Sequence, residues 1–530
     1  MEELSILDEV RVLLVNYDVF LDRYTSTLQS LSSIVVKSST VKNYRIMLAN
    51  NKELWNAIAK CSRTANRGTL ESIKDRNFYL RTVKGVVLLA RNLSVENQIL
   101  PQEFSLQDNV VDFLSSFQPL YDEMEVALYQ VGYEFLYNIS RNCITFNQAT
   151  LDALCQVLSY PSRLECNEAL TLPWSLYFSR IIRNEEFAYC FLKHPSCDQI
   201  LFDYMIEDII KNNTNLFDAI GTKSHSLEEL STLGSIQADI WVCIVSNESF
   251  TKYLKKVESQ NWDIFHNILL LSQLIVTSSE KWDKYQLTSI MAWAYGIFES
   301  AAKNVELYFE DDLDDDLLAH RLHQNMTISL DIISALSKFE HVRKFILFYG
   351  GLEVLIKTLG TLQKNCIKIN FHKDTAGVVS NVITTNDMGE KIENTKKINK
   401  RIDYASGSIK PTNFPECKSL IIEILGFLAY KNREVQDKCR ELHGMELVLS
   451  NCLIDDNDPF IKERSIICIR LLLEENQENQ WFVAQLEAKK AVDNEVLSQA
   501  GYEVKIDHSG QIQLASKPTG DIDDTNVIMS

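Results

Sequence analysis

Residues 415–486 have the sequence PECKSLIIEILGFLAYKNREVQDKCRELHGMELVLSNCLIDDNDPFIKERSIICIRLLLEENQENQWFVAQL. In the first part of this stretch, apolar side chains recur at the spacing of one helix face: Ile421, Ile424, Leu425 and Leu428. This spacing predicts a helix that buries one stripe. Polar residues take over at 430–432, so we expect the helix to end there.

Two short helices and a long one are predicted to follow. The short helices cover 434–442 and 445–452, and Gly444 between them tolerates the left-handed conformation that closes a helix. The long helix is predicted to start with Asp458 as its N-terminal cap and Pro459 in its first turn. Its expected buried residues are Phe460, Ile466, Ile467, Ile469, Leu472 and Leu473.

This order of helices is typical of an armadillo repeat. The polar junction of residues 431–436 returns at 476–480, about one armadillo or HEAT period later. Residues 325–362 show the same order of helices, and similar long-helix endings occur at 86–98 and 133–140. One such repeat cannot cover its own apolar face, so neighbouring repeats must stack on it. The predicted fold class is therefore all-α, an armadillo/HEAT-like α-solenoid of stacked helical repeats.

Five segments are predicted along the chain. Residues 1–363 form the N-terminal repeats, and residues 413–494 form the C-terminal ones. Between them, 364–412 is rich in Asn, Thr, Lys, Ser and Gly without apolar periodicity, which predicts a disordered insertion within a repeat. Alternating apolar residues on both sides of a turn predict a small β-hairpin in 495–517. Residues 518–530 are predicted to be a frayed tail.

Several short motifs stand in order in the C-terminal repeats: Leu428-Ala429-Tyr430-Lys431-Asn432, Gln436-Asp437-Lys438, Leu449-x-Asn451-Cys452, Asp455-Asp456-Asn457-x-Pro459-Phe460 and Asn476-Gln477-x-Asn479-Gln480. Together they resemble the C-terminal signature of the armadillo-like ataxin-10 family. They are most similar to its fungal members, which carry the name copper transport protein 86. The resemblance is specific from 415 to 516 and looser upstream. It implies a cytosolic protein linked to partner proteins and to the regulation of cytokinesis.

Composition narrows the classes of partner. The 530-residue chain carries a net charge of −19 at pH 7. Binding to nucleic acid requires a basic footprint, so we expect neither nucleic acid nor an anionic membrane as a partner. No apolar run reaches the roughly 20 residues that span a bilayer, and the N-terminus lacks a signal-peptide pattern. The scattered cysteines are typical of a reducing compartment, which predicts a cytoplasmic protein.

The sequence contains no recognisable catalytic motif. Phosphate-binding loops, H-E-x-x-H and G-x-S-x-G are all absent, so we expect neither an enzyme nor a cofactor. The acidic run 310–316 lacks the turn glycine and the closing glutamate of a calcium loop, and we interpret it as a solvated loop that could face a basic partner. His194 and Cys197 are too few for a zinc or copper site, and the methionines are isolated. No metal site is expected.

Candidate partner-binding residues stand at the ends of the long third helices and at the next junction. They are Asn92, Asn138, Tyr430, Asn432, Arg470, Asn476 and Gln480. In armadillo repeats the third helix lines the concave face, where asparagine can bond an extended peptide, and tyrosine and arginine often anchor interfaces. The alternative is that these residues only satisfy helix ends and repeat packing. For Asn92 and Asn138 we favour that alternative.

The leading hypothesis is a non-catalytic armadillo-type scaffold that binds other proteins or extended peptides in a groove. The family resemblance adds a role in cytokinesis and cell division. One alternative is a copper-handling protein, as the fungal name suggests. Another is an import adaptor that binds basic peptides. Self-association is a further option, and the basic residues in 391–401 would suit a nuclear address, a partner tether or a solubilising loop.

Overall fold

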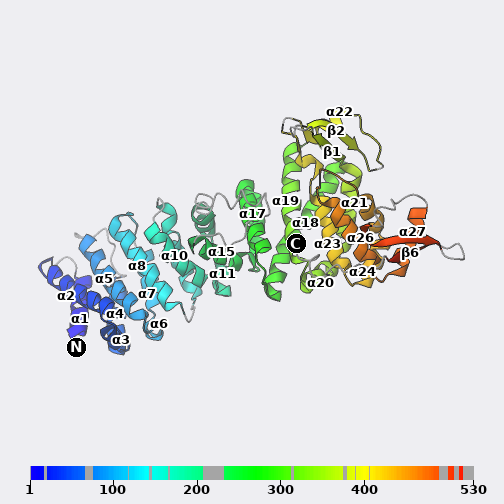
Figure 1. The fold of residues 1–530 in the computed structure, drawn as a ribbon. Coiled ribbons are helices and arrows are strands. Elements are labelled where there is room, and N and C mark those ends of the chain that lie inside the picture. Colours follow the sequence, from blue (N-terminus) through cyan, green and yellow to red (C-terminus); the bar gives the residue numbers. More distant parts are fainter. Residues whose placement is uncertain are drawn as a thin grey trace. The chain divides into compact units, whose positions relative to one another are not determined.

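The computed structural model describes residues 2–16, 21–65, 76–116, 118–141, 146–164, 168–206, 232–311, 315–373, 379–387, 389–404, 406–488, 499–506 and 512–516. The chain divides into two compact units, residues 1–278 and 279–530, and each is described by itself (Figure 1). This boundary differs from the one predicted at residue 363, because the repeat that precedes the insertion belongs to the second unit.

Unit 1 consists, in its described residues, of helices: α1 (Glu2–Val15), α2 (Leu21–Thr40), α3 (Lys42–Ala49), α4 (Lys52–Ala65), α5 (Arg76–Ser94), α6 (Ile99–Glu103), α7 (Leu106–Ser115), α8 (Glu123–Ile139), α9 (Leu151–Leu158), α10 (Glu168–Ile181), α11 (Glu185–Phe191), α12 (Cys197–Ile200), α15 (Thr232–Val245), α16 (Phe250–Gln260) and α17 (Trp262–Ser278). Short turns of other helix types occur at Gln148–Thr150, Tyr160–Arg163 and Leu201–Ile206.

The helices of unit 1 stack in two rows (Figure 1). In one row α2 contacts α5, α5 contacts α8, α8 contacts α10 and α10 contacts α15. In the other, α1 contacts α4, α4 contacts α7 and α7 contacts α9. Large side chains such as Trp55, Trp174 and Trp241 are fully buried in this stack. This is the helical-repeat stacking that the sequence predicted.

Unit 2 contains helices and three two-stranded antiparallel sheets, β1–β2, β3–β4 and β5–β6, in its described residues. Its elements are α18 (Lys284–Glu310), α19 (Asp316–Leu336), α20 (Glu340–Phe348), α21 (Gly351–Asn365), β1 (Lys368–Lys373), β2 (Val379–Thr385), α22 (Thr395–Asn399), β3 (Ile402–Asp403), β4 (Ser408–Ile409), a 3-10 turn (Pro411–Asn413), α23 (Cys417–Ala429), α24 (Arg433–Glu441), α25 (Gly444–Ser450), α26 (Ile461–Leu473), α27 (Gln477–Ala488), β5 (Tyr502–Ile506) and β6 (Ile512–Ser516).

The predicted succession of helices in 415–486 is confirmed by α23, α24, α25 and α26, but the role of Gly444 was wrong. His443 takes the left-handed conformation, with φ 59°, and Gly444 begins α25. A Cβ at Gly444 would lie 3.0 Å from Cδ1 of Ile356 and 3.2 Å from the carbonyl oxygen of Cys439. Glycine is therefore needed here because α25 packs closely on its neighbours.

The predicted start of the long helix also needs correction. α26 begins at Ile461, and Asp458 does not cap it but is buried with its Oδ1 near the backbone nitrogen of Ser419, at 3.4 Å. Phe460 is 65% exposed and Ile467 41% exposed, although both were expected in the core. They lie outside the core because α26 buries a narrower stripe, which includes Cys468, Ile469, Leu472 and Leu473.

The insertion 364–412 was predicted to be disordered, and this was wrong for its described residues. β1 pairs with β2 from Lys368↔Thr385 to Lys373↔Val379. A small core of Ile367, Ile369 and Ile402 is at most 2% exposed, and further apolar residues pack against it: Phe371, Val382, Ile392, Ile398 and Ile409. The insertion is ordered because these dispersed residues converge, although they show no local periodicity.

The C-terminal hairpin is confirmed by β5 and β6, which pair from Tyr502↔Ser516 to Ile506↔Ile512. Tyr502 is 6% exposed, and β6 contacts α27. The predicted tail 518–530 and the centre of the acidic run, residues 312–314, lie outside the described residues.

Candidate interaction surface

The side chains of Asn92 and Asn138 make hydrogen bonds between helices of unit 1. Asn92 is 4% exposed, and its Nδ2 donates to the carbonyl oxygen of Val35 at 3.2 Å and to Oγ of Ser38 at 3.0 Å. The half-buried Asn138 donates to the carbonyl oxygen of Arg91 at 3.2 Å. The two amides tie α5 to α2 and α8 to α5, which is the packing role considered above.

Asn476 lies in the interior of unit 2 and is 0% exposed. Its Nδ2 donates to Oε1 of Gln436 at 3.1 Å and to Oδ1 of Asp437 at 3.0 Å, and its Oδ1 accepts the backbone N–H of Asn479 at 3.0 Å. The amide of Asn479 donates to the carbonyl oxygens of Gln436 at 3.1 Å and Leu472 at 2.8 Å. These signature residues therefore join α24 to α27 and leave Asn476 no surface for a partner.

Two arginines complete this junction. Nε of Arg433 and Nη1 of Arg440 each donate to the carboxylate of Asp437 at 3.1 Å. Burial alone would raise the pKa of Asp437, but the hydrogen bonds from Asn476, Arg433 and Arg440 outweigh it and lower this pKa. The carboxylate therefore stays charged and holds the junction together.

Asn432 and Gln480 are half-buried and bonded locally. Asn432 is the N-terminal cap of α24, and its side chain accepts from the backbone N–H of Val435 at 3.3 Å. Nε2 of Gln480 donates to the carbonyl oxygen of Leu473 at 2.8 Å. Neither side chain is fully exposed, so both can contribute at most the edge of an interaction surface.

Tyr430 and Arg470 lie on a shared surface of unit 2. The long helices α19, α23 and α26 stack side by side, because α23 contacts both of the others. Partly or fully exposed residues of these helices recur at helical spacing, and we call the surface that they form the third-helix face: Thr327, Asp331, Glu423, Phe427, Tyr430, Arg464, Ile467 and Arg470.

Glu423 holds the centre of the third-helix face in place. Its Oε2 accepts from Oγ of Ser334 on α19 at 2.8 Å and lies 3.1 Å from Nη2 of Arg464 on α26. Nη1 of Arg464 also donates to Oγ of Ser419 at 3.0 Å. Three helices are therefore crosslinked by side chains that stand at the surface itself.

The third-helix face combines apolar, aromatic and charged groups. Tyr430 is half-buried, and Nζ of Lys431 lies 5.1 Å from the centroid of its ring. Arg470 and Ile467 are exposed. Burial raises the pKa of Tyr502 to about 12, and the nearby charge of Arg470 only partly offsets this. Ile467 and Arg470 are three residues apart on α26, so an aliphatic group and an arginine are neighbours on this helix, which suits a polypeptide partner.

A buried charge cluster supports the loop between α25 and α26. Nζ of Lys418 lies 3.0 Å from Oδ2 of Asp455, and both side chains are at most 3% exposed. Asp458 is also fully buried, and its Oδ2 has no hydrogen-bond partner among the described residues. On the same loop, Leu453 and Ile454 are 54% and 69% exposed.

The cluster raises the pKa values of both Asp458 and Lys418, but for different reasons. Burial raises the pKa of Asp458 to about 6, and the charge of Asp455 adds to the effect, while Lys418 opposes it. Burial favours a neutral Lys418, but the two carboxylates outweigh it and raise the lysine pKa. Lys418 and Asp455 therefore form a charged pair beside an aspartate that gains a proton in mildly acidic solution.

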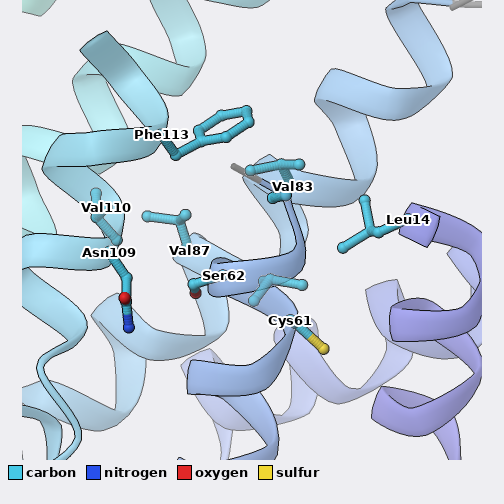
Figure 2. Close-up of a pocket in the computed structure, with 10 residues that line it drawn as sticks. Leu14, Cys61, Ser62, Val83, Val87, Asn109, Val110 and Phe113 are labelled. Carbon is cyan, nitrogen blue, oxygen red and sulfur yellow. The ribbon is translucent and has the colours of Figure 1, made fainter. Parts of the chain in front are cut away.

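A small cavity in unit 1 has no room for a substrate. Its volume is about 10 Å³, and it is lined mainly by apolar side chains, with Cys61, Ser62 and Asn109 among the lining residues (Figure 2). A cavity of this size holds one water at most. Burial raises the pKa of Cys61 to about 12, and its thiol donates to the carbonyl oxygen of Leu7 at 3.3 Å, so this cysteine is no nucleophile.

Within the described ranges, no group of three or more His, Cys, Asp or Glu side chains is arranged to hold a metal ion. Ten cysteines there are unpaired, and eight of them are buried. Among the same residues no single helix is long and apolar enough to cross a membrane, and one pair, α20 and α21, passes that test only together and across a 78° bend.

Comparison with known proteins agrees with the motifs in unit 2. A family model described as "Spinocerebellar ataxia type 10 protein domain" matches residues 417–515. A protein of Candida glabrata named Ataxin-10 homolog is 38% identical over 525 residues, which cover 97% of this chain and 99% of the relative. This chain belongs to the ataxin-10 family. The Saccharomyces cerevisiae member, also named Ataxin-10 homolog, is 34% identical over 98% of this chain and 96% of its own length.

More distant family members match a shorter part. Human Ataxin-10 is 42% identical over 88 residues, which are 17% of this chain and 18% of the human protein. An engineered protein and a circular tandem repeat protein of known structure align with 88% and 94% of the chain at 12% identity, but their TM-scores of 0.27 and 0.25 are too low to carry an argument. The relatives compared here are named for ataxin-10 and not for copper transport.

The sequence-based selection of Tyr430 and Arg470 as partner-binding residues stays a prediction, and it missed two groups of functional interest. One sequence feature could have revealed the buried cluster of Lys418, Asp455 and Asp458. It is the run of acidic residues within an apolar stretch. The exposed pair Leu453 and Ile454 carried none, because an apolar residue in a short turn looks the same whether it is buried or exposed.

Proposed function

We propose that this helical-repeat protein is a non-catalytic scaffold whose third-helix face binds other proteins or extended peptides. The observation that carries the proposal is the side-by-side stacking of α19, α23 and α26, with Tyr430 half-buried directly after α23 and Ile467 and Arg470 exposed on α26. Tyrosine and arginine are the residue types that most often dominate binding energy. The network around Glu423 fixes the surface before a partner arrives, which lowers the cost of binding.

Membership of the ataxin-10 family supports a non-enzymatic role. We further propose that the protein is cytoplasmic and acts in the regulation of cytokinesis. This process-level part of the proposal rests on the family alone. A second copy of the chain is among the partners to be tested.

The alternatives receive less support. A copper-handling protein would need a cluster of soft ligands, and the described residues hold none that could bind a metal. An import adaptor would need an acidic groove for basic peptides. The third-helix face carries Arg464 and Arg470 beside Asp331 and Glu423, so its charge is mixed.

The test is affinity purification from cells with crosslinking, in which the wild-type chain is compared with a Tyr430→Ala/Arg470→Ala variant. We expect the variant to lose at least ~90% of the bound partners, since truncating two anchor residues typically costs a few kcal/mol in total. A second, differently tagged copy of the chain in the same cells tests self-association.

The matched control is Tyr285→Ala/Lys303→Ala. These two residues are exposed on α18, outside the third-helix face, and the substitutions remove one tyrosine and one cation. The control should retain all partners. Unchanged partner recovery by the Tyr430/Arg470 variant, with its helical content intact by circular dichroism, would refute the proposal.

A further inference from the structure

Three aromatic rings gather at the C-terminal end of α20, and we call them the α20 aromatic cluster: Phe345, Phe348 and Tyr349. Their spacing makes them neighbours on one side of the helix. The ring centroids of Phe345 and Tyr349 are 4.5 Å apart, and those of Phe348 and Tyr349 are 5.1 Å apart. The ring of Tyr295 on α18 meets Phe345 edge-on at 6.2 Å, so the cluster rests on the neighbouring helix.

The α20 aromatic cluster is open to solvent. Phe348 is 82% exposed and Tyr349 is 56% exposed, whereas Tyr295 is 6% exposed. One exposed apolar side chain is common on any protein, but a contiguous group of exposed rings marks an interaction site. The hydroxyl of Tyr295 donates to the carbonyl oxygen of Tyr349 at 3.4 Å, and Gly350 turns the chain with φ 69°. The backbone beneath the rings is therefore fixed.

The charge next to the cluster is negative. A Cβ at Gly350 would lie 4.0 Å from a carboxylate oxygen of Glu353, so this acid folds back onto the turn that follows Tyr349. Glu299 stands one helical turn after Tyr295 on α18. Burial raises the pKa of Tyr295 to about 12, and the charges of Glu299 and Glu353 add to the effect. Both carboxylates therefore act on the base of the cluster.

Neither carboxylate is neutralised within the described part of the chain. Glu299 and Glu353 are exposed and make no ion pair or side-chain hydrogen bond with another described residue, and this includes Lys303 one turn beyond Glu299. Lys344 on α20 and Lys357 on α21 are each paired with a different glutamate, at 2.6 and 2.7 Å. The C-terminus of α20, which is the negative end of the helix dipole, adds to the same field.

Aromatic rings beside unpaired carboxylates favour a planar cation. A guanidinium stacks on an aromatic face and donates to a carboxylate at the same time, which an ammonium does less well. We propose that the α20 aromatic cluster, together with Glu299 and Glu353, binds an arginine-bearing segment of a partner protein that has aliphatic residues beside the arginine. The site goes beyond the third-helix face, which is formed by other helices, and does not depend on it.

A lipid surface fits the cluster less well. The helices α20 and α21 pass the test for a membrane span only together, across a 78° bend. Apolar side chains of α21, such as Leu355 and Leu359, are buried inside unit 2 and do not face a bilayer. The two carboxylates beside the rings would also lose water on entering lipid, which is costly for an unpaired charge. Charge and burial therefore favour a protein segment.

The experiment titrates the full chain against a dye-labelled peptide of Gly-Leu-Arg repeats and follows fluorescence anisotropy. Physiological salt screens exposed charges beyond about 8 Å, so the net charge of −19 does not hold the peptide by itself. Phe348→Ala/Tyr349→Ala should weaken binding at least ~10-fold, and Glu299→Gln/Glu353→Gln at least ~3-fold, because the ring and charge contacts of the guanidinium are lost. A peptide with lysine for arginine should bind more weakly, and one with glutamate should not bind.

Each variant has a matched control. Tyr285→Ala/Phe460→Ala removes one tyrosine and one phenylalanine that are 83% and 65% exposed elsewhere in unit 2. Glu434→Gln/Glu463→Gln removes two exposed carboxylates on α24 and α26. Both controls should bind the arginine peptide like the wild type, and circular dichroism verifies that every variant keeps its helical content.

A Tyr430→Ala/Arg470→Ala variant separates this site from the third-helix face, and it should keep full affinity for the peptide. Wild-type affinity of the Phe348→Ala/Tyr349→Ala variant, equal weakening in its matched control, or no binding of the peptide to the wild type would each overturn the proposal. So would cosedimentation with phosphatidylcholine vesicles that requires Phe348 and Tyr349 in place of peptide binding, because it would assign the cluster to a lipid surface.

Discussion

Glu125 in unit 1 and Asp455 in unit 2 are both buried carboxylates, but they connect different ranges of the chain. Glu125 accepts the backbone N–H groups of Leu120 at 2.9 Å and Tyr121 at 2.6 Å, and it pairs with Arg76. Asp455 pairs with Lys418 and accepts the N–H of Ile369, which is 86 positions away. The first carboxylate mainly secures the start of its own helix, whereas the second assembles distant segments.

This difference predicts how each site responds when its cation is removed. A carboxylate that keeps two local backbone donors remains solvated by the protein. Asp455 also keeps local donors, the backbone N–H and the amide of Asn457, but loss of Lys418 leaves it fully buried beside Asp458 without a cation. We therefore expect the larger effects in unit 2.

The largest effect is expected for Lys418→Met. It leaves Asp455 and Asp458 buried without the cation between them, and breaking a buried pair in this way typically costs about 3–5 kcal/mol. Urea unfolding, with hydrogen exchange of α23 and α26 to locate the loss, measures the change in the free energy of unfolding.

Lys344→Met is the control for that substitution. Its ammonium lies 2.6 Å from a carboxylate oxygen of Glu340, with both side chains at least 70% exposed. The same charge is lost at the surface, so the free energy of unfolding should not change measurably. Equal losses for the two lysine variants would show that burial of the pair does not matter.

A smaller, pH-dependent effect is expected for Asp458→Asn. The folded-state pKa of Asp458, about 6, lies above its ordinary value of 3.8, so the folded chain binds this proton more tightly than the unfolded chain. The contribution of Asp458 to stability is therefore present below pH ~4, falls as the pH rises through 6, and is constant above that.

The difference between Asp458→Asn and the wild type should grow by on the order of 2–3 kcal/mol in favour of the variant from pH 4 to pH 7. Chemical unfolding at a series of pH values measures it. A difference that is flat with pH, or that grows in the opposite direction, would contradict the raised pKa.

The smallest effect is expected for Arg76→Met. Glu125 keeps its bonds to Leu120 and Tyr121, and Asp122 can turn to solvent because its side chain is 42% exposed. We expect a loss of about 1–2 kcal/mol, visible as faster hydrogen exchange in the first turn of α8. If Arg76→Met lowers the free energy of unfolding as much as Lys418→Met does, the proposed difference between Glu125 and Asp455 is wrong.

The repeat architecture of unit 2 was predictable because helical periodicity is local. The stripe from Ile421 to Leu428 and the turn at Gly350, which has φ 69°, were both recognisable within a few residues. The selection of Tyr430 and Arg470 as partner-binding residues used the same periodicity and stays a prediction. Asn476 was not placed correctly, since an asparagine near a helix end can equally face a partner or satisfy the interior.

The fold of the insertion was not predictable in the same way. Ile367, Ile369 and Phe371 alternate as a strand does, but three residues are too few to stand out among polar neighbours. The groups that bind them are the side chains at 455–457, which lie far along the chain. Only the folded repeat brings these side chains and the segment together. No local sequence pattern could therefore show that residues 455–457 bind the segment.

The binding of backbone groups of 367–371 by residues 455–457 and Asn413 has a practical consequence for dividing the protein into fragments. A recombinant piece limited to residues 417–515 would match the family span yet lack β1 and Asn413. Its loop at 455–457 would present unfilled hydrogen-bonding groups where the backbone of 367–371 is normally bound. Such a piece should be prone to aggregation. A piece that begins before α21 would include β1 and Asn413, which bind these groups.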